Sequence, residues 1–330
     1  MLDACPQWYD LAVSRYGELS IHRWMLRDEV RNEAYRQALL HVVKPGHVVL
    51  DMGAGTGILS IFAAQAGARK VYAVERTEVA AVARRMVASN GFDDHIEVIQ
   101  ADLEDVDLPE KVDVIVSEWM GGLGVDENML APLVMARDRW LGPGGTIIPG
   151  RVTAILAPAS VTEFDGALEY WRSRPHNVDM SVIANITTHE TFMTQAYLTL
   201  PDLVAEPRAM WSHDPHTCSL EEADSSFQAK LTFEAANEGK LSGFVGWFTA
   251  EMPNGRTLTS AVGAAHTHWG RMLFPLDHPI EVVAGTPIHV ELHCDPSIPG
   301  SCEFYWAARI GDRPLEEHDT RHNRQRTRQL

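Results

Sequence analysis

The chain has 330 residues, 45% of them hydrophobic, and a formal net charge of -17 at pH 7. A chain of this length and hydrophobic content can bury the cores of two domains. The excess of negative charge argues against nucleic acid as the main partner and suits a cationic ligand.

The cysteines and the N-terminus bear on the compartment in which the protein works. Four cysteines are scattered without CxxC spacing, which is typical of a reduced cytoplasmic protein and not of a disulfide scaffold or a zinc site. Residues 1–10 lack the charged-then-apolar pattern of a signal peptide, and no apolar run approaches membrane-spanning length. The sequence therefore predicts a cytoplasmic protein without a membrane partner. Its abundance of arginine over lysine, together with its many alanines, favours a bacterial origin.

The first predicted element is an amphipathic helical segment from Trp8 to Leu40. Its apolar residues recur at three- to five-residue steps between charged positions, and Pro45-Gly46 ends the pattern. We interpret residues 1–44 as a helical cap over the domain that follows.

From residue 45 to residue 150, apolar strands alternate with helices. The predicted strands are Val48–Met52, Lys70–Glu75, Ile96–Ala101, Val112–Ser117 and Thr146–Ile148, and the predicted helices are Ile58–Ala68, Val79–Ser89 and Asn128–Leu141. This order predicts a Rossmann-like parallel sheet with crossover helices. Such sheets bind ligands beyond the carboxyl ends of their strands, which is where this chain carries Asp51, Glu75, Asp102 and Glu118.

After residue 150 the strands follow one another without crossover helices. They are predicted at Val152–Leu156, Gln195–Leu200, Gln228–Phe233, Leu241–Ala250, Pro287–His293 and Phe304–Ala308. Residues 151–312 are therefore predicted to form an antiparallel, barrel-like β-domain, interrupted by a partly helical insertion over residues 161–190. The polar, arginine-rich residues 313–330 are predicted to be a disordered tail.

A glycine-rich turn, residues 51–57 with the sequence DMGAGTG, joins the first strand to the first helix of the alternation. Glycines let the backbone approach a ligand closely, and the start of the helix offers free N–H groups. A nicotinamide dinucleotide enzyme typically has GxGxxG with a pyrophosphate on the helix. An aspartate ahead of the glycines would repel pyrophosphate but suits the amino group of S-adenosylmethionine. Glu75 is placed to accept hydrogen bonds from ribose hydroxyls of either cofactor.

The loop from Ser117 to Glu127 contains two glutamates, Glu118 and Glu127, on either side of three glycines. The glycines allow a sharp reversal that brings the two carboxylates toward each other, and the carboxylates then repel unless a cation lies between them. A solvated acidic loop is the simpler interpretation of such a pair taken alone. The neighbouring motifs favour a cation-binding site instead.

Together these residues resemble the protein arginine methyltransferase family. The resemblance runs from about Tyr16 to Ile310 and depends above all on the segments SEWMG at 117–121 and THW at 267–269. It also rests on residues 26–31, 49–59, 103–104, 114–129, 136–138, 140–141 and 178–181. It implies S-adenosylmethionine as cofactor, arginine or an arginine-containing molecule as substrate, and a homodimer formed through the insertion at 161–190.

The resemblance also implies roles for individual residues. Glu118 and Glu127 would grip the substrate guanidinium, and His268 would pair with Asp28. Arg31 would bind the carboxylate of the cofactor. The implied cofactor site comprises His22, Met25, Arg31, Asp51, Gly53, Gly55, Glu75, Leu103 and Glu104, and the implied substrate site comprises Tyr16, Asp126, Met129 and Trp269. No metal is predicted, because His266 and His268 have no evident third ligand.

This chemistry has a physical basis. A guanidinium has a pKa above about 12, and its delocalised nitrogens are poor nucleophiles. Two carboxylates would bind its donor fork and draw positive charge away from the nitrogen that attacks the methyl group, so catalysis would depend on positioning and electrostatics. Glu127, or His268 together with Asp28, would take up the proton.

Two loop positions depart from the family pattern, since Gly122 and Asp126 stand where the family usually has tyrosines. Losing aromatic walls alters the substrate mouth, and a carboxylate at Asp126 would suit the α-ammonium group of a free amino acid. The sequence slightly favours free L-arginine or a related guanidino compound and keeps peptidyl arginine open. A non-catalytic scaffold of the same fold and an NAD-dependent oxidoreductase are further alternatives, which the intact acidic residues disfavour.

Overall fold

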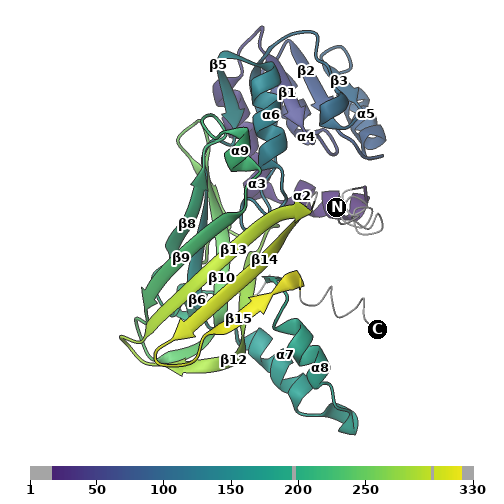
Figure 1. Ribbon diagram of the computed structural model, residues 1–330. Helices are drawn as coiled ribbons and strands as arrows, with labels where there is room; N and C mark the ends of the chain where they lie inside the picture. The colour runs from purple at the N-terminus through teal and green to yellow at the C-terminus, as the bar shows by residue number, and fades with distance from the viewer. Residues whose placement is uncertain (1–16, 195–197, 299–300, 322–330) are drawn as a thin grey trace, which may run out of the picture.

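The computed structural model describes residues 17–194, 198–298 and 301–321. They form a parallel α/β unit and an antiparallel β unit, with the helices α2 and α3 between the two (Figure 1). No helix within the described ranges is long and apolar enough to cross a membrane. The predicted fold class, a Rossmann-like domain followed by an antiparallel β-domain, is confirmed.

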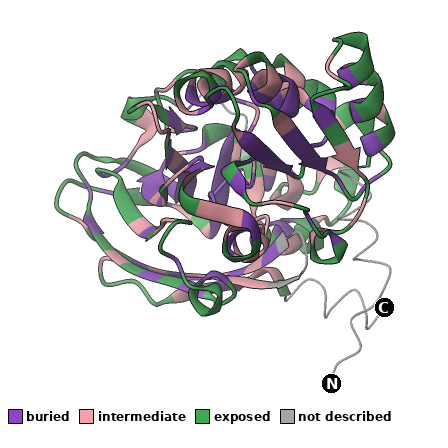
Figure 2. Ribbon diagram, turned by 90° about the horizontal axis from the view of Figure 1, so that it is seen from above, coloured by how far each residue is buried: buried purple, intermediate pink, exposed green. Residues whose placement is uncertain are grey.

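The α/β unit is built on a five-stranded sheet with the strand order β3-β2-β1-β4-β5. Its central strands are apolar and largely buried, as expected where helices cover both faces (Figure 2). Because β1 pairs in parallel with both β2 and β4, Met52 lies beside Val74 and Ser117, and the residues that follow these strands meet at one edge of the sheet. The strands are β1 Val48–Met52, β2 Lys70–Val74, β3 Ile96–Ile99, β4 Val112–Ser117 and β5 Leu141–Ile148, and the helices are α4 Ile58–Gln65, α5 Ala80–Ser89, η1 Leu103–Asp105 and α6 Leu130–Trp140.

Two helices, α2 (Leu19–Arg27) and α3 (Glu29–Val42), precede this sheet. The predicted helical segment is divided at Asp28, whose carboxylate accepts a hydrogen bond from the backbone N–H of Arg31 at 2.9 Å and so caps α3. The part of that prediction before residue 17 lies outside the described residues. α3 turns its buried residues toward the α/β unit, which fixes both helices over the edge where the strands end.

The antiparallel unit has two sheets. The first has the order β7-β12-β10-β6-β8, with β11 also paired to β10, and the second has the order β15-β14-β13-β9. Between β6 and β7, the helices α7 and α8 form an arm that projects from the far end of this unit (Figure 1). The elements are β6 Val152–Ala159, α7 Thr162–Arg172, η2 Pro175–Asn177, α8 Ser181–Thr187, β7 Phe192–Thr194, η3 Leu200–Asp202, β8 Arg208–His213, α9 Leu220–Ala223, β9 Phe227–Glu234, β10 Gly239–Glu251, β11 Thr257–Thr259, β12 Arg271–Val282, β13 Pro287–Ile298, β14 Ser301–Ile310 and β15 Glu316–Asp319.

The strands of the antiparallel unit differ from the sequence prediction at several places, and β7, β8 and β11 were not predicted. β12 was not predicted, because Pro275 and Pro279 interrupt its apolar run and proline is disfavoured in strands. The strand expected at 195–200 is wrong in its described part, where η3 begins at Leu200; β7 ends before it. The prediction of a disordered tail from residue 313 is wrong for β15, which pairs with β14.

β15 forms in a polar segment because one of its side chains is fully enclosed. His318 is 1% exposed, and its ring stacks on Trp306 with centroids 5.0 Å apart and an interplanar angle of 8°. The Nδ1 atom of His318 lies 2.8 Å from the carbonyl oxygen of Thr188 at the end of α8. β15 therefore ties the arm to the second sheet.

One large hydrophobic core runs through both units, and a second, smaller cluster lies within the antiparallel unit. One cluster of buried residues includes Leu50 and Ile115 of the parallel sheet, Trp119 of the loop after β4, and Phe248 and Trp306 of the antiparallel unit. The loop that carries the two glutamates thus passes through the core where the two units meet.

Close packing within this core predicts that replacing glycine by alanine in β10 destabilises the protein at one position and not at another. A Cβ added at Gly243 in β10 would lie against the carbonyl oxygen of Phe274 and 2.8 Å from the Cα of Pro275. One added at Gly239 in the same strand meets no atom of the described residues within 4 Å. We expect Gly243→Ala to lower the free energy of unfolding by about 1–3 kcal/mol. Gly239→Ala is the matched control. Thermal unfolding monitored by circular dichroism checks this, and equal melting temperatures for the two variants would contradict it.

Candidate active site

A cavity of about 190 Å³ lies at the carboxyl ends of β1, β2 and β4, under α2 and α3. It brings together residues from the glycine turn, the strand ends, the N-terminal helices and the glutamate loop. Of the predicted site residues it is lined by His22, Met25, Arg31, Gly53, Gly55, Glu75, Leu103, Glu104, Glu118, Glu127 and Met129. Three separate segments of the chain, which carry Glu75, Glu104 and the pair Glu118 and Glu127, thus contribute acids to one space.

The glycine turn forms one wall of this cavity. Gly53, Gly55 and Gly57 have φ angles of 71°, 54° and 81°, a region that favours glycine. At Gly55 space matters too, because a Cβ there would fall 2.9 Å from the His22 ring. Glu75 fixes the turn by accepting hydrogen bonds from the N–H groups of Gly55 at 2.9 Å and Thr77 at 2.8 Å.

Asp51 does not line the cavity with the other predicted cofactor residues. It is fully buried beneath the turn, where its Oδ2 accepts a hydrogen bond from the Ser60 hydroxyl at 2.6 Å and its Oδ1 has no hydrogen-bond partner among the described residues. Burial raises its pKa to about 6, against the opposing effect of the hydrogen bonds from Ser60. Ser60 was not predicted, because a serine inside an apolar helix carries no signal of its contact.

Arg31 and Glu118 form a buried ion pair in the wall of the cavity. Their closest nitrogen and oxygen are 3.4 Å apart, and their side chains are 6% and 9% exposed. Arg31 Nε and Glu118 Oε1 are both buried without a hydrogen-bond partner among the described residues. Because unpaired buried polar atoms are costly, the site has a donor suited to an anionic ligand and an acceptor suited to a cationic one.

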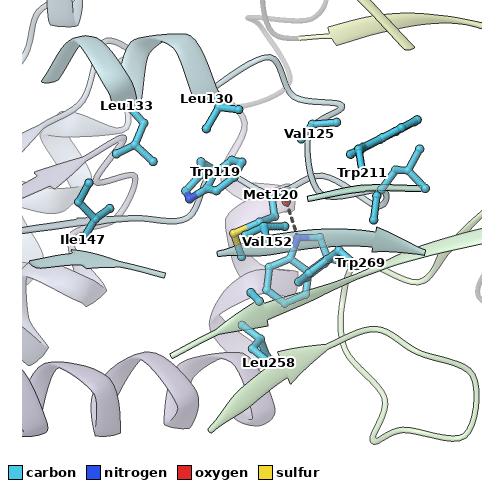
Figure 3. Close-up of a cluster of buried hydrophobic side chains, with 14 of the residues drawn as sticks. Trp119, Met120, Val125, Leu130, Leu133, Ile147, Val152, Trp211, Leu258 and Trp269 are labelled. Atoms are coloured by element: carbon cyan, nitrogen blue, oxygen red, sulfur yellow. Dashed lines mark hydrogen bonds between the residues drawn. The ribbon is translucent and has the colours of Figure 1, made fainter. Parts of the chain in front are cut away.

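The residues between the two glutamates hold the loop in the core. Trp119, Met120 and Leu123 are fully buried, so Glu118 and Glu127 face the cavity from the two ends of an anchored segment. Trp269 donates a hydrogen bond from its indole Nε1 to the carbonyl oxygen of Met120 at 2.6 Å (Figure 3). Trp269 is itself only 5% exposed, and this hydrogen bond supports the loop; its contact with substrate stays a prediction.

The predicted pairing of His268 with Asp28 is present. Asp28 Oδ2 lies 2.9 Å from His268 Nδ1 and accepts a hydrogen bond from the His268 backbone N–H at 2.8 Å. Burial acts to raise the pKa of Asp28, but hydrogen bonds from His268 and from the backbone of Arg31 outweigh it and lower that pKa. Neither residue lines the cavity. Their contact joins the N-terminal helices to the segment before β12.

Asp126 is placed differently from its predicted role. Its carboxylate turns back into the loop, where it accepts hydrogen bonds from the N–H groups of Gly122 at 3.1 Å and Leu123 at 2.7 Å. Burial raises the pKa of Asp126 even though these N–H groups act to lower it. The carboxylate is therefore not directed at a substrate ammonium group. Tyr16, the remaining predicted substrate residue, lies outside the described residues.

Tyr35 contributes to the site although it was not predicted to. Its hydroxyl donates to the carbonyl oxygen of Ser117 at 3.1 Å, and the Arg31 guanidinium lies over its ring, 5.5 Å from the centroid. The four-residue spacing from Arg31 places both on one face of α3, which is the signal that could have identified it.

The buried Asp51 predicts a pH-dependent stability difference. The pKa of Asp51 is about 6 in the folded protein, above its ordinary value of 3.8. Between these two pH values the folded protein therefore binds more protons than the unfolded chain. Its contribution to stability thus decreases as pH rises through this window. We expect the free energy of unfolding of Asp51→Asn, relative to that of the wild type, to increase by roughly 1 kcal/mol on going from pH 5 to pH 7.5. Melting temperatures at both pH values test this, with the exposed Asp93→Asn as control. A pH-independent difference would contradict it.

Family models match both units of the chain. Residues 36–148 match the model described as ribosomal protein L11 methyltransferase (PrmA), and residues 152–301 match the one described as the arginine methyltransferase oligomerization subdomain. In solved structures, the fold is similar to that of a Trypanosoma brucei PRMT1 enzyme-prozyme complex with AdoHcy, with a TM-score of 0.82, 28% identity, and coverage of 92% of this chain and 98% of that one. Arabidopsis thaliana protein arginine methyltransferase 10 in an open conformation gives a TM-score of 0.77, 33% identity, and coverage of 93% and 98%.

Sequence comparison agrees. Protein arginine N-methyltransferase 6 of Xenopus laevis is 37% identical over 292 residues, which cover 86% of this chain and 85% of the relative. Protein arginine N-methyltransferase PRMT10 of Arabidopsis thaliana is 36% identical over 310 residues, covering 84% and 80%. The resemblance seen in the motifs is confirmed, and the chain belongs to the protein arginine N-methyltransferase family.

Proposed function

We propose that this protein transfers a methyl group from S-adenosylmethionine to a guanidino nitrogen of arginine within a protein substrate. One observation carries the proposal: Glu118 and Glu127 line the same cavity as the glycine turn and Arg31, and Glu118 Oε1 is buried without a partner among the described residues. A cationic group with several N–H donors satisfies that acceptor.

The residues around the cavity fit the cofactor. When bound, S-adenosylmethionine supplies an electrophilic methyl group on a sulfonium. Arg31, with its unpaired Nε, would hold the carboxylate of the cofactor, and the glycines at 53 and 55 allow its close approach to the backbone. Glu75 would accept from ribose hydroxyls with the lone pairs left by its two backbone hydrogen bonds. Leu103 and Glu104 in η1, with His22 and Met25 in α2, complete the walls.

The two glutamates would act on the guanidinium. Glu118 and Glu127 bind its N–H groups and localise its positive charge away from the nitrogen that is methylated. Glu118 is paired with Arg31 at 3.4 Å, and because a carboxylate has lone pairs on both oxygens, its free Oε1 can accept from the substrate while Oε2 keeps this contact. Glu127 would take up the proton released on transfer, and the His268–Asp28 pair offers a further acceptor next to the site.

Peptidyl arginine is a better substrate assignment than free arginine. The preference for free arginine came from an extra carboxylate at Asp126, and that carboxylate is occupied by two N–H groups of its own loop. The relatives that match most of the chain carry the name protein arginine N-methyltransferase. Both findings favour an arginine held in a polypeptide.

The arm supports assembly into a homodimer. α7 and α8 project from the antiparallel unit, and they and the η2 turn between them expose the large apolar side chains of Tyr170, Val178, Val182 and Ile183. Apolar surface gathered on a projecting element is typical of an interface. The matching model, which spans the arm, is described as an oligomerization subdomain.

The glutamate clamp predicts a selective loss of turnover. Glu127→Gln removes a negative charge from the guanidinium site, so we expect kcat to fall by about 100- to 1000-fold. The affinity for S-adenosylhomocysteine, measured by calorimetry, should stay within about threefold, because the glycine turn and Arg31 are unchanged. Glu238→Gln, in an exposed turn, is the control.

A comparison of methylated products distinguishes the two candidate substrates. Mass spectrometry of products from an arginine-glycine-rich peptide and from free L-arginine, side by side, should show methylation of the peptide. Methylation of free arginine alone would overturn the substrate assignment. Cofactor binding without methylation of either would support a non-catalytic role.

The arm predicts a change in oligomeric state. Val182→Asp places a charge in the exposed apolar patch, so we expect a dimer in wild type and a monomer in the variant by light scattering. Glu163→Gln, an exposed polar change on α7, should leave the dimer intact. A dimer that tolerates Val182→Asp would show that the arm is not the interface.

A further inference from the structure

Asp126, the residue immediately before Glu127, closes the glutamate loop on itself. Its Oδ2 accepts from the N–H of Gly122 at 3.1 Å and its Oδ1 from the N–H of Leu123 at 2.7 Å. The carboxylate lies against Gly121, where a Cβ would be 2.6 Å from Oδ1, so the loop has room for this arrangement only with glycine there. One side chain therefore links both sides of the reversal between Glu118 and Glu127.

Among the described residues, the groups that contact the Asp126 carboxylate are hydrogen-bond donors of the backbone. No ion pair of Asp126 is found within the described ranges, and backbone N–H groups are the groups that act to lower its pKa against the effect of burial. A carboxylate with both oxygens committed to backbone donors resists rotation toward a ligand, because leaving the N–H groups unpaired is costly. Asp126 thus stabilises one conformation of residues 121–126.

Asn128, on the other side of Glu127, is anchored to the antiparallel unit. Its Nδ2 donates to the carbonyl oxygen of Pro296 in β13 at 2.7 Å, and its backbone has a φ of 53°, a conformation that asparagine tolerates better than most residues. Glu127 is therefore held between two fixed neighbours, one tied to the loop itself and the other to β13.

We propose that Asp126 is a positioning residue for Glu127, with Asn128 as the second anchor. Asp126 keeps the turn closed, and the closed turn holds the Glu127 carboxylate where it faces the same cavity as Glu118. This inference rests on the proposed function, in which the two carboxylates share one guanidinium. A displacement of about 1 Å in such a site reduces turnover by roughly 100-fold. Asp126 therefore affects the rate without contacting the substrate.

The experiment compares four variants of the full-length protein. Asp126→Ala removes both acceptors, and Asp126→Asn keeps one oxygen for the Leu123 N–H. Asn128→Gly removes the amide while allowing the positive φ angle. Asp93→Ala, at an exposed turn, is the matched control for lost charge. The readouts are peptide methylation kinetics, calorimetry with S-adenosylhomocysteine, and hydrogen–deuterium exchange of residues 119–128 in the cofactor-free protein.

The expected pattern separates positioning from binding. Asp126→Ala should lower kcat by roughly 100-fold and Asp126→Asn and Asn128→Gly by roughly 10-fold, with the KM for peptide and the affinity for S-adenosylhomocysteine within about threefold of wild type. Amide exchange of residues 119–128 should rise most in Asp126→Ala. Asp93→Ala should change none of these.

Other outcomes overturn the proposal. A raised KM with unchanged kcat would mean that Asp126 contacts substrate, and unchanged exchange would mean that its hydrogen bonds do not hold the loop. If Asp126→Ala fails to fold, Asp126→Asn and Asn128→Gly decide the question. A wild-type protein that methylates no arginine substrate defeats the proposed function instead, and the exchange measurement still decides whether Asp126 holds the loop.

Discussion

The Asp28 carboxylate joins the parts of the molecule that form the site. Its Oδ1 caps α3 through the Arg31 N–H, and its Oδ2 meets the backbone and side chain of His268, 240 residues later in the chain. Because a cap fixes the first turn of a helix, it also fixes where Arg31 points. Trp269, next to His268, then holds the glutamate loop through Met120. One buried acid thereby aligns the cofactor side of the cavity with its substrate side.

Much of this architecture could be predicted from the sequence because it follows from periodicity. The alternation of strands and helices up to residue 148 predicts a parallel sheet, and a parallel sheet gathers the ends of its strands. Glu75 and Glu118 could therefore be assigned to one cavity from their positions alone. The pairing of His268 with Asp28 needed the family resemblance, since no local pattern connects positions so far apart.

For the site residues, the expectations that the geometry does not support concern the direction of a side chain. Asp51 points beneath the turn to Ser60 and Asp126 points into its own loop, and neither direction follows from the residue type. Tryptophan is a residue type often found in binding sites, but the indole N–H of Trp269 donates a hydrogen bond to the loop. In β12 and β15, tertiary contacts override an unfavourable local sequence, as the stacking of His318 on Trp306 illustrates.

The continuity of the hydrophobic core limits how the chain can be divided. Trp119, Met120 and Leu123 follow β4, yet they are buried at the junction with the antiparallel unit. A fragment that stopped at Ile148 would expose these side chains to water, at about 1.5–3 kcal/mol for each one. An exchange of the α/β unit between relatives would therefore have to preserve the contacts of these side chains with the β-domain. In this molecule the loop between Glu118 and Glu127 is also part of the core that joins the two units.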